Sequence, residues 1–209
     1  MNGKIAALAA LLSAMALPVA ASAADQSNWY AGFDAGQAHF AGLTNGLTLP
    51  AGVTSHTSDN DNSFRISGGY QFNRYFGVEG GWVDFGSAEL DLTSTSPAGT
   101  GSGKIKAHGL FVVGTGMYPF TDQWSVFGRF GTIDGHKDFT WSGTGSLAGL
   151  GSNQSSTDWK LTYGVGVDWM FHSNWSARAA YDQYANIGNH NKTGEDNINV
   201  ISVGIVYHF

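Results

Sequence analysis

The chain has 209 residues and no cysteine, and its 10 Lys and Arg residues are outnumbered by 16 Asp and Glu residues, for a formal net charge of −6. Nucleic acid is a poor partner for such a chain, because phosphate binding needs clustered Lys and Arg. Without disulfides, a chain of this length depends on its own backbone hydrogen bonds and packing.

The first 23 residues have the organisation of a secretory signal peptide. Lys4 supplies the positive charge, residues 5–17 form the apolar run, and Ala21-Ser22-Ala23 is a small-x-small cleavage site. The apolar run is shorter than the roughly 20 residues that a membrane-spanning helix needs. We therefore predict a signal peptide over residues 1–23 and a single domain over residues 24–209.

Eight segments of this domain alternate apolar and polar residues with the period of two that is typical of β-strands. Each reaches the roughly 9–11 residues with which a tilted strand crosses a bilayer. No apolar run after the signal peptide has helical membrane length, and a closed sheet is the other structure that satisfies every backbone group in lipid. The predicted strands are Trp29–Phe40, Asn62–Phe72, Phe76–Leu92, Lys104–Tyr118, Trp124–Trp141, Thr157–Phe171, Trp175–Ile187 and Asn197–Phe209.

The connections between these segments alternate in length. Three are tight turns, at residues 73–75, 119–123 and 172–174, and four are longer and rich in Gly, Ser, Thr and Asn, at residues 41–61, 93–103, 142–156 and 188–196. Short periplasmic turns and long extracellular loops are usual in outer-membrane barrels. The sequence thus predicts an all-β fold, an eight-stranded antiparallel up-and-down transmembrane β-barrel with both termini on the periplasmic side.

The two faces of the predicted strands differ in chemistry. One face is apolar and is expected to meet lipid, with aromatic residues gathered beside the short turns as a periplasmic girdle. A soluble β-sandwich, the alternative, has no reason to ring one rim with aromatic side chains. The other face is expected to fill the barrel with paired charges rather than leave an open channel, because eight strands enclose just enough space for side chains. Its polar members are Asp34, Arg65, Gln71, Glu79, Thr115, Arg129, Lys160, Thr162, Asp168, Arg178 and Asp182.

The last strand carries a further signal. Ile201, Val203, Ile205, Tyr207 and Phe209 share one face, and the chain stops on the final aromatic residue. This pattern resembles the signal that the barrel-assembly machinery recognises, so we expect Tyr207 and Phe209 to act in insertion.

Two segments, Tyr75–Gly86 and Tyr163–Gly188, resemble the transmembrane domain of the outer membrane protein A family. In that family, salt bridges inside the barrel have been proposed to act as a gate. The resemblance places Glu79, Asp168 and Arg178 in this network, and Thr115 stands where the family has a lysine. Arg129 or Lys160 is then expected to replace that lysine.

Two groups of residues are candidates for a catalytic or metal site. His172-Ser173-Asn174 echoes a motif of lipid A deacylases, but it falls in a periplasmic turn and lacks an orienting acid. Asp134, His136 and Asp138 gather near the outer end of one strand, where solvated surface groups are the simpler interpretation. The HExxH and CxxC metal signatures are absent from the sequence. We therefore expect no catalytic residues, no metal and no cofactor.

These observations predict a non-enzymatic protein of the outer membrane of a Gram-negative bacterium. We expect a role in envelope integrity and in surface interaction through four extracellular loops. One alternative is a narrow gated pore for water and small ions, and a second is a lipid A–modifying enzyme. The expected partners are outer-membrane lipid and lipopolysaccharide, with the barrel-assembly machinery during insertion. A monomer is expected, and no ligand of the loops is evident.

Overall fold

The computed structural model describes residues 28–41, 53–95, 97–149, 152–189 and 194–209. The predicted signal peptide lies outside these residues. No helix in the described part of the chain has the length and apolar character needed to span a bilayer. The described residues form nine strands: β1 (Trp29–Phe40), β2 (Val53–Ser58), β3 (Asn60–Gln71), β4 (Phe76–Thr95), β5 (Ala98–Pro119), β6 (Trp124–Gly145), β7 (Gln154–His172), β8 (Trp175–Asn189) and β9 (Gly194–His208).

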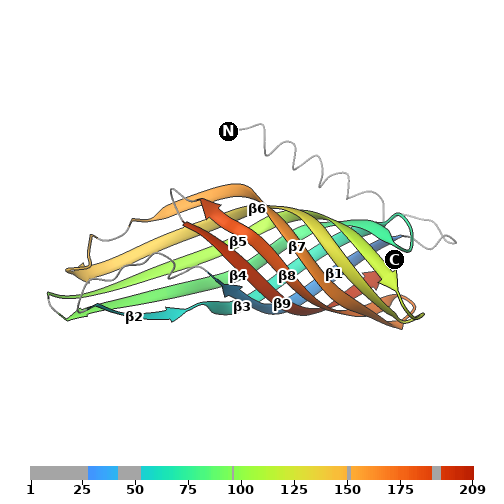
Figure 1. Cartoon of the computed structure of the whole chain (residues 1–209), viewed down its shortest axis with the longest axis horizontal. Helices are drawn as coiled ribbons and strands as arrows, with labels where there is room; N and C mark the ends of the chain where they lie inside the picture. The colour runs from blue at the N-terminus through green and yellow to red at the C-terminus, as the bar shows by residue number, and fades with distance from the viewer. Residues whose placement is uncertain (1–27, 42–52, 96, 150–151, 190–193) are drawn as a thin grey trace.

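Eight of these strands close into an antiparallel barrel in which chain neighbours are also spatial neighbours (Figure 1). Strand β1 pairs with β3 on one side and with β9 on the other, and the pairing of β4 with β5 completes the ring. Closure leaves no unpaired edge within the barrel, as lipid requires. The predicted eight-stranded up-and-down topology is therefore confirmed. One additional strand, β2, lies outside the ring.

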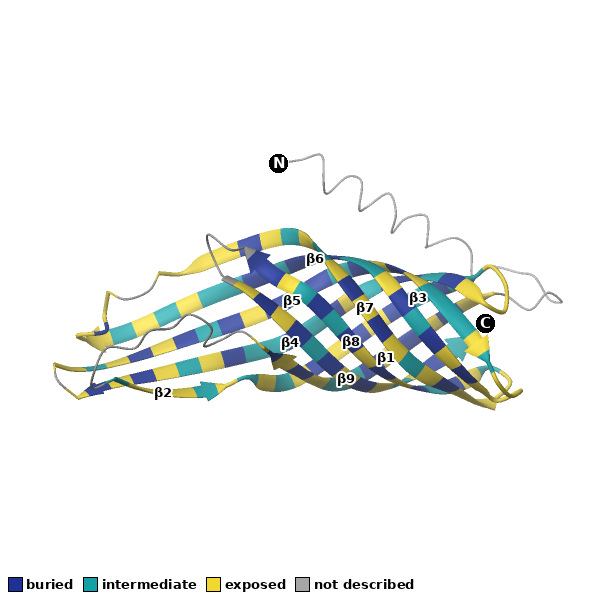
Figure 2. Cartoon of the chain, in the orientation of Figure 1, coloured by how far each residue is buried: buried dark blue, intermediate teal, exposed yellow. Residues whose placement is uncertain are grey.

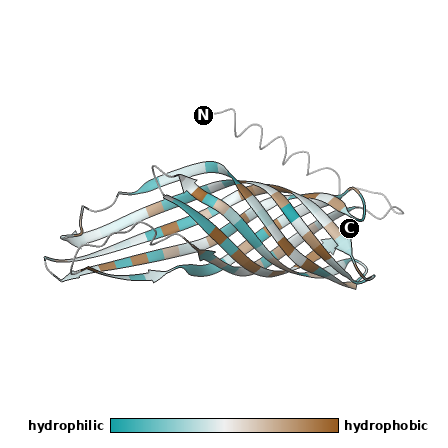
Figure 3. Cartoon of the chain, viewed as in Figure 1, coloured by the Kyte–Doolittle hydropathy of each residue, from teal (hydrophilic) through white to brown (hydrophobic). Residues whose placement is uncertain are grey.

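Side chains alternate between the inside and the outside of the barrel, as Figure 2 shows by burial and Figure 3 by hydropathy. Apolar residues that would be buried in a soluble protein are exposed here, including Phe130 at 63% and Ile201 at 67% of their surface. Aromatic rings also pack together at the rim that holds the short turns. The ring centres of Trp124 and Trp169 are 5.7 Å apart, and those of Trp175 and Tyr207 are 4.9 Å apart. The predicted outward apolar face and the aromatic girdle beside the short turns are both present.

The three short turns are where the sequence places them, and two of them are capped by side chains. Asn73 Oδ1 accepts hydrogen bonds from the backbone N–H groups of Tyr75 and Phe76, and Thr121 Oγ1 accepts from those of Gln123 and Trp124. Asn and Thr side chains favour such tight turns because they replace a missing backbone partner.

The extracellular side differs from the prediction. Of the regions expected to be loops, residues 93–103 are largely strand, because β4 and β5 continue far beyond the barrel. In the region 142–156, β6 extends to Gly145 and β7 begins at Gln154. Strand β2 lies in the region expected to be the first loop and pairs with the outer part of β4. These strands form a sheet, here called the wall, that comprises β2 and residues 87–95, 98–108 and 134–145 and rises on one side of the barrel (Figure 1).

A β-bulge separates the wall from the barrel on β4. The register shifts between Asp84 and Ser87, and Gly86 adopts a φ of +72°, a conformation that glycine tolerates best. The carboxylate of Asp61 accepts hydrogen bonds from the backbone N–H (2.7 Å) and the hydroxyl (3.1 Å) of Ser87. Because an extra residue exchanges the two faces of a strand, inward positions of β4 are odd-numbered before the bulge and even-numbered after it.

Candidate functional site

Glu79 lies at the centre of an ionic network inside the barrel. Its carboxylate accepts hydrogen bonds from the guanidinium groups of Arg65 (2.5 Å), Arg129 (3.3 Å) and Arg178 (3.0 Å), and from the hydroxyl of Tyr30 (3.1 Å). These residues come from five different strands, and all five are buried. The network therefore ties opposite sides of the barrel together through one carboxylate.

Two aspartates complete the network. Asp182 receives two hydrogen bonds from Arg129, at 2.7 and 2.6 Å, and lies 3.7 Å from Arg65. Asp168 receives two from Arg178, its direct cross-strand neighbour, at 3.2 and 3.1 Å. Paired bonds of this kind match the planar guanidinium group to a carboxylate and are stronger than bonds between neutral groups. Three arginines thus face three carboxylates within the network.

A fourth carboxylate, that of Asp34, lies beside this network. Asp34 is buried on β1, and neither of its oxygens has a hydrogen-bond partner among the described residues. Across the strand pair, Arg65 is its direct neighbour. Such a buried polar group calls for a water molecule or a proton, since an isolated buried charge is costly.

The lumen on the extracellular side of the network is apolar. Along β4, Glu79 at the centre of the network is followed by the inward residues Val83 and Phe85. Along β8, Asp182 is followed by Tyr184 and Ile187. The rings of Phe85 and Tyr184 pack edge to face, 4.6 Å apart. Together with other buried residues of β1, β5, β6 and β9, these side chains form one cluster, here called the apolar plug. The expectation of a wholly polar interior was therefore wrong for this half of the barrel.

The network and the apolar plug meet at one contact. The guanidinium group of Arg65 lies 3.8 Å above the centre of the Phe111 ring, which is part of the plug. A cation over an aromatic face is favourable, and more so away from water. Beyond the plug, a second buried ion pair joins Lys137 of β6 to Asp196 of β9.

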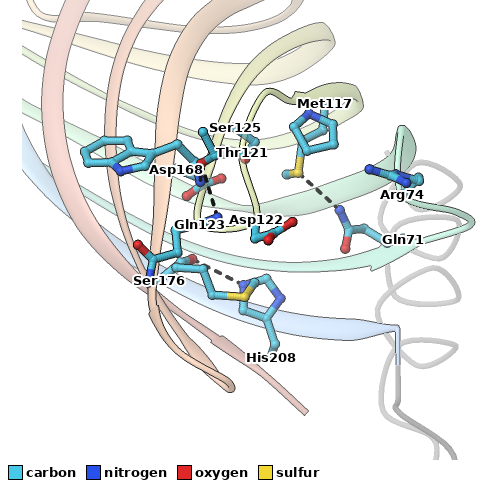
Figure 4. A pocket seen from close by; sticks show the side chains of 13 residues that line it. Gln71, Arg74, Met117, Thr121, Asp122, Gln123, Ser125, Asp168, Ser176 and His208 are labelled. Carbon is cyan, nitrogen blue, oxygen red and sulfur yellow. Dashed lines mark hydrogen bonds between the residues drawn. The ribbon is translucent and has the colours of Figure 1, made fainter.

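The periplasmic end of the lumen is open. A pocket of about 310 Å³ lies there, and its lining includes Asp168, Ser176 and His208 (Figure 4). The hydroxyl of Ser176 lies 3.2 Å from His208 Nε2, and the Gln71 amide donates to the sulfur of Met117 at 3.5 Å. Asp168 belongs to both the pocket and the network, so the network borders the pocket on this side.

The predicted site residues separate into two groups. Glu79, Asp168, Arg178 and Arg129 are brought together, and Arg129 is the direct cross-strand neighbour of Thr115, the position where the family has a lysine. Lys160 is not part of the network. Its ammonium group binds Glu195 at 2.8 Å in a partly exposed pair nearer the outer rim.

Three members of the network were not assigned to it from the sequence. Arg65 and Asp182 were predicted only to face inward, and Tyr30 was not singled out. Period-two alternation was the available signal for all three, because Tyr30 shares the inward face of β1 with Asp34.

The other candidate residues lie far from the network. In the turn at His172, Ser173 Oγ is 3.3 Å from both His172 Nδ1 and Asn174 Oδ1. On the outside of β6, His136 Nε2 lies 3.2 Å from Asp138. The described residues contain no cluster of three or more His, Asp or Glu suited to a metal ion. Tyr207 and Phe209 pack together at the periplasmic rim, 5.0 Å apart, and their role in insertion stays a prediction.

Comparison with known proteins fits this geometry. The OmpA-like transmembrane domain family matches residues 24–209 of the chain. The chain belongs to the OmpA-like transmembrane domain family. Outer membrane protein A of Klebsiella pneumoniae is 27% identical over 192 residues, which cover 90% of this chain and 53% of that protein. Outer membrane protein A of Serratia marcescens is 28% identical over 210 residues, covering 97% of this chain and 55% of that protein. The OmpA-like chain thus spans about half the length of these relatives.

Solved structures show the same fold. OprG of Pseudomonas aeruginosa superimposes with a TM-score of 0.56 at 15% identity, covering 88% of this chain and 97% of that one. Neisserial surface protein A superimposes with a TM-score of 0.55 at 15% identity, covering 89% of this chain and 100% of that one. This OmpA-like chain is accordingly an outer-membrane β-barrel, and its named relatives come from Gram-negative bacteria.

Proposed function

We propose that this OmpA-like barrel is a non-enzymatic protein that supports the integrity of the outer membrane and makes surface contacts through its extracellular rim. The observation that carries the proposal is the division of the molecule into a filled barrel and a projecting wall. The ionic network and the apolar plug occupy the lumen in succession, while β4, β5 and β6 extend outward. Binding surfaces are commonly displayed on rigid scaffolds of this kind.

The gated pore is less well supported. Rearranging the ionic network alone would still leave Phe85, Tyr184 and their neighbours in the path. Hydrated ions do not cross a packed apolar layer without a large desolvation cost. We therefore expect planar bilayers that contain the refolded protein to stay silent, whereas discrete and reproducible openings would favour the pore.

Cells that lack the gene test the envelope role. We expect them to become more sensitive to detergents and to large antibiotics, and the full-length gene to restore resistance. A second complementing gene should replace residues 89–104 with Asn-Gly, a two-residue hairpin turn joining Ala88 to Ile105, which already face each other. This trimmed barrel should restore detergent resistance but not surface contacts. Unchanged sensitivity in the deletion strain would contradict the proposal, and an altered lipid A acylation pattern in that strain would favour an enzyme.

A further inference from the structure

The outward face of the wall continues the lipid-facing surface of the barrel without interruption. Along β5 the outward residues, read from the membrane toward the exterior, are Val112 and Leu110, then His108, Lys106 and Lys104, then Ser102 and Thr100. The chemistry of this one column therefore changes in order from apolar to basic to hydroxyl.

The aromatic girdle fixes the height of each layer. The apolar band of such barrels is about 25 Å tall, which a strand tilted by about 40° crosses in roughly ten residues. Ten residues from Tyr118 of the periplasmic girdle is His108, and ten residues from Trp169 on β7 is Trp159, which is 50% exposed. Lys106 and Lys104 follow immediately above this boundary, at the height of lipid headgroups.

No other outward Lys or Arg lies at this height in the described ranges. Arg65, Arg129 and Arg178 are inside the barrel, Lys137 is buried, and Lys160 is bound to Glu195. Arg74, the remaining one, lies in the periplasmic turn at the opposite end. Within the described part of the chain, the outward positive charge at this height is thus confined to two neighbouring positions of β5.

Both lysines are accessible to an anionic ligand. Lys104 donates to Glu89 at 2.6 Å, but both side chains are exposed, and exposed pairs contribute little and exchange partners readily. Lys106 is exposed and has no ion pair among the residues that the structure describes. Its cross-strand neighbour Asp138 lies 3.2 Å from His136 Nε2.

Above the lysines the wall presents register-matched hydroxyl groups. Thr54, Thr93, Thr100 and Thr144 form one row across β2, β4, β5 and β6, and the hydroxyls of Thr100 and Thr144 lie 2.9 Å apart. A shallow hollow of about 380 Å³ on these strands is lined by Thr93, Thr100 and Thr144 together with Asp91, Ser102 and Ser142. Hydroxyls and a carboxylate suit the many donors and acceptors of a sugar.

We propose that the outward column of β5, together with the hydroxyl row beside it on β4 and β6, is a docking surface for one lipopolysaccharide molecule of the outer leaflet. Leu110 and Val112 meet its acyl chains, Lys104 and Lys106 bind its phosphates, and the hydroxyl rows contact its sugars. This inference deepens the proposed function and rests on it for the outward orientation of the wall. The occupant is chosen because an acyl chain, a phosphate and an oligosaccharide follow one another in the order that the column presents.

The test uses the refolded full-length domain in detergent micelles and fluorescently labelled lipopolysaccharide, with binding followed by anisotropy. We expect Lys104→Gln and Lys106→Gln each to weaken binding about fivefold, the effect of one basic residue at an anionic lipid surface. Arg74→Gln removes the same charge at the opposite rim and should leave binding unchanged. Heat-modified gel mobility confirms that every variant is folded.

Two further arms identify the ligand. Replacing Thr93, Thr100 and Thr144 with alanine should weaken binding of lipopolysaccharide but not of lipid A, which lacks the outer sugars. Phosphatidylglycerol should compete poorly. A variant that carries both Lys104→Gln and Lys106→Gln would overturn the proposal if it bound as tightly as the unmodified protein. Competition by phosphatidylglycerol as strong as that by lipopolysaccharide would overturn it too. A failure here with a persisting envelope defect in the deletion strain would leave the proposed function standing.

Discussion

Replacing Arg178 with methionine tests whether the ionic network holds the barrel together. Arg178 donates two hydrogen bonds to Asp168 and one to Glu79, and it is the only ion-pair partner of Asp168 among the described residues. Glu79 keeps Arg65 and Arg129 in the variant. The principal loss is therefore the uncompensated charge of Asp168.

Removing one partner of a buried ion pair costs about 3–5 kcal/mol. Asp168 borders the periplasmic pocket, so water partly replaces the lost partner. We accordingly expect Arg178→Met to lower the free energy of unfolding by about 3 kcal/mol, the lower end of that range. Arg178→Lys keeps the charge but loses the paired hydrogen bonds, and about half of that loss is expected for it.

The assay is urea unfolding of the domain refolded in lipid vesicles, followed by tryptophan fluorescence. Adding Asp168→Asn to Arg178→Met removes the uncompensated charge and should recover most of the lost stability. Arg74→Met, on the exposed periplasmic turn, should stay within about 0.5 kcal/mol of the unmodified protein. A midpoint for Arg178→Met equal to that of the Arg74→Met control, or no recovery in the double variant, would refute this reasoning.

Three other changes probe separate parts of the molecule. Phe85→Ala opens the apolar plug beside Tyr184 and should cost about 3–5 kcal/mol in urea unfolding; an effect below 1 kcal/mol would mean that the plug is loosely packed. Gly86→Ala places a methyl group at a φ of +72° and against the Asp61 carboxylate, so we expect the free energy of unfolding to fall by about 1–3 kcal/mol. Gly116→Ala, where a methyl group meets nothing within 4 Å, is the control. Burial opposes the charge of Asp61, but hydrogen bonds from Ser87 and Asn62 outweigh it and lower its pKa. A lowered folded-state pKa contributes stability at neutral pH that is lost as the pH falls through that pKa. The stability advantage over Asp61→Asn should therefore shrink in acid, and a difference independent of pH would contradict this.

Sequence periodicity identified which side chains enter the barrel but not how high they lie in it. Lys160 and Asp168 share the inward face of β7, yet eight residues separate them, which is roughly 20 Å along the barrel axis. Only Asp168 reaches the arginines, and Lys160 meets Glu195 instead. Height also decides which lumenal positions are charged and which belong to the apolar plug, and no single strand contains that information.

Strand β2 was not predicted from the sequence, for a different reason. Its residues, Val-Thr-Ser-His-Thr-Ser, are polar on both faces because neither lipid nor a packed core covers them. The extensions of β4, β5 and β6 are rich in Gly, Ser and Thr, a composition that also describes loops. Alternation of hydropathy reveals a strand only where its two faces meet different surroundings.

Because the wall stands on one side only, the barrel has two different flanks within the plane of the membrane. A cylinder of even height offers every approaching neighbour the same flank. Here, among the residues that the structure describes, β4, β5 and β6 extend well past the ends of β1, β8 and β9 (Figure 1). A bulky neighbour in the membrane is therefore expected to meet a taller surface on the flank of β4, β5 and β6 than on the flank of β1, β8 and β9.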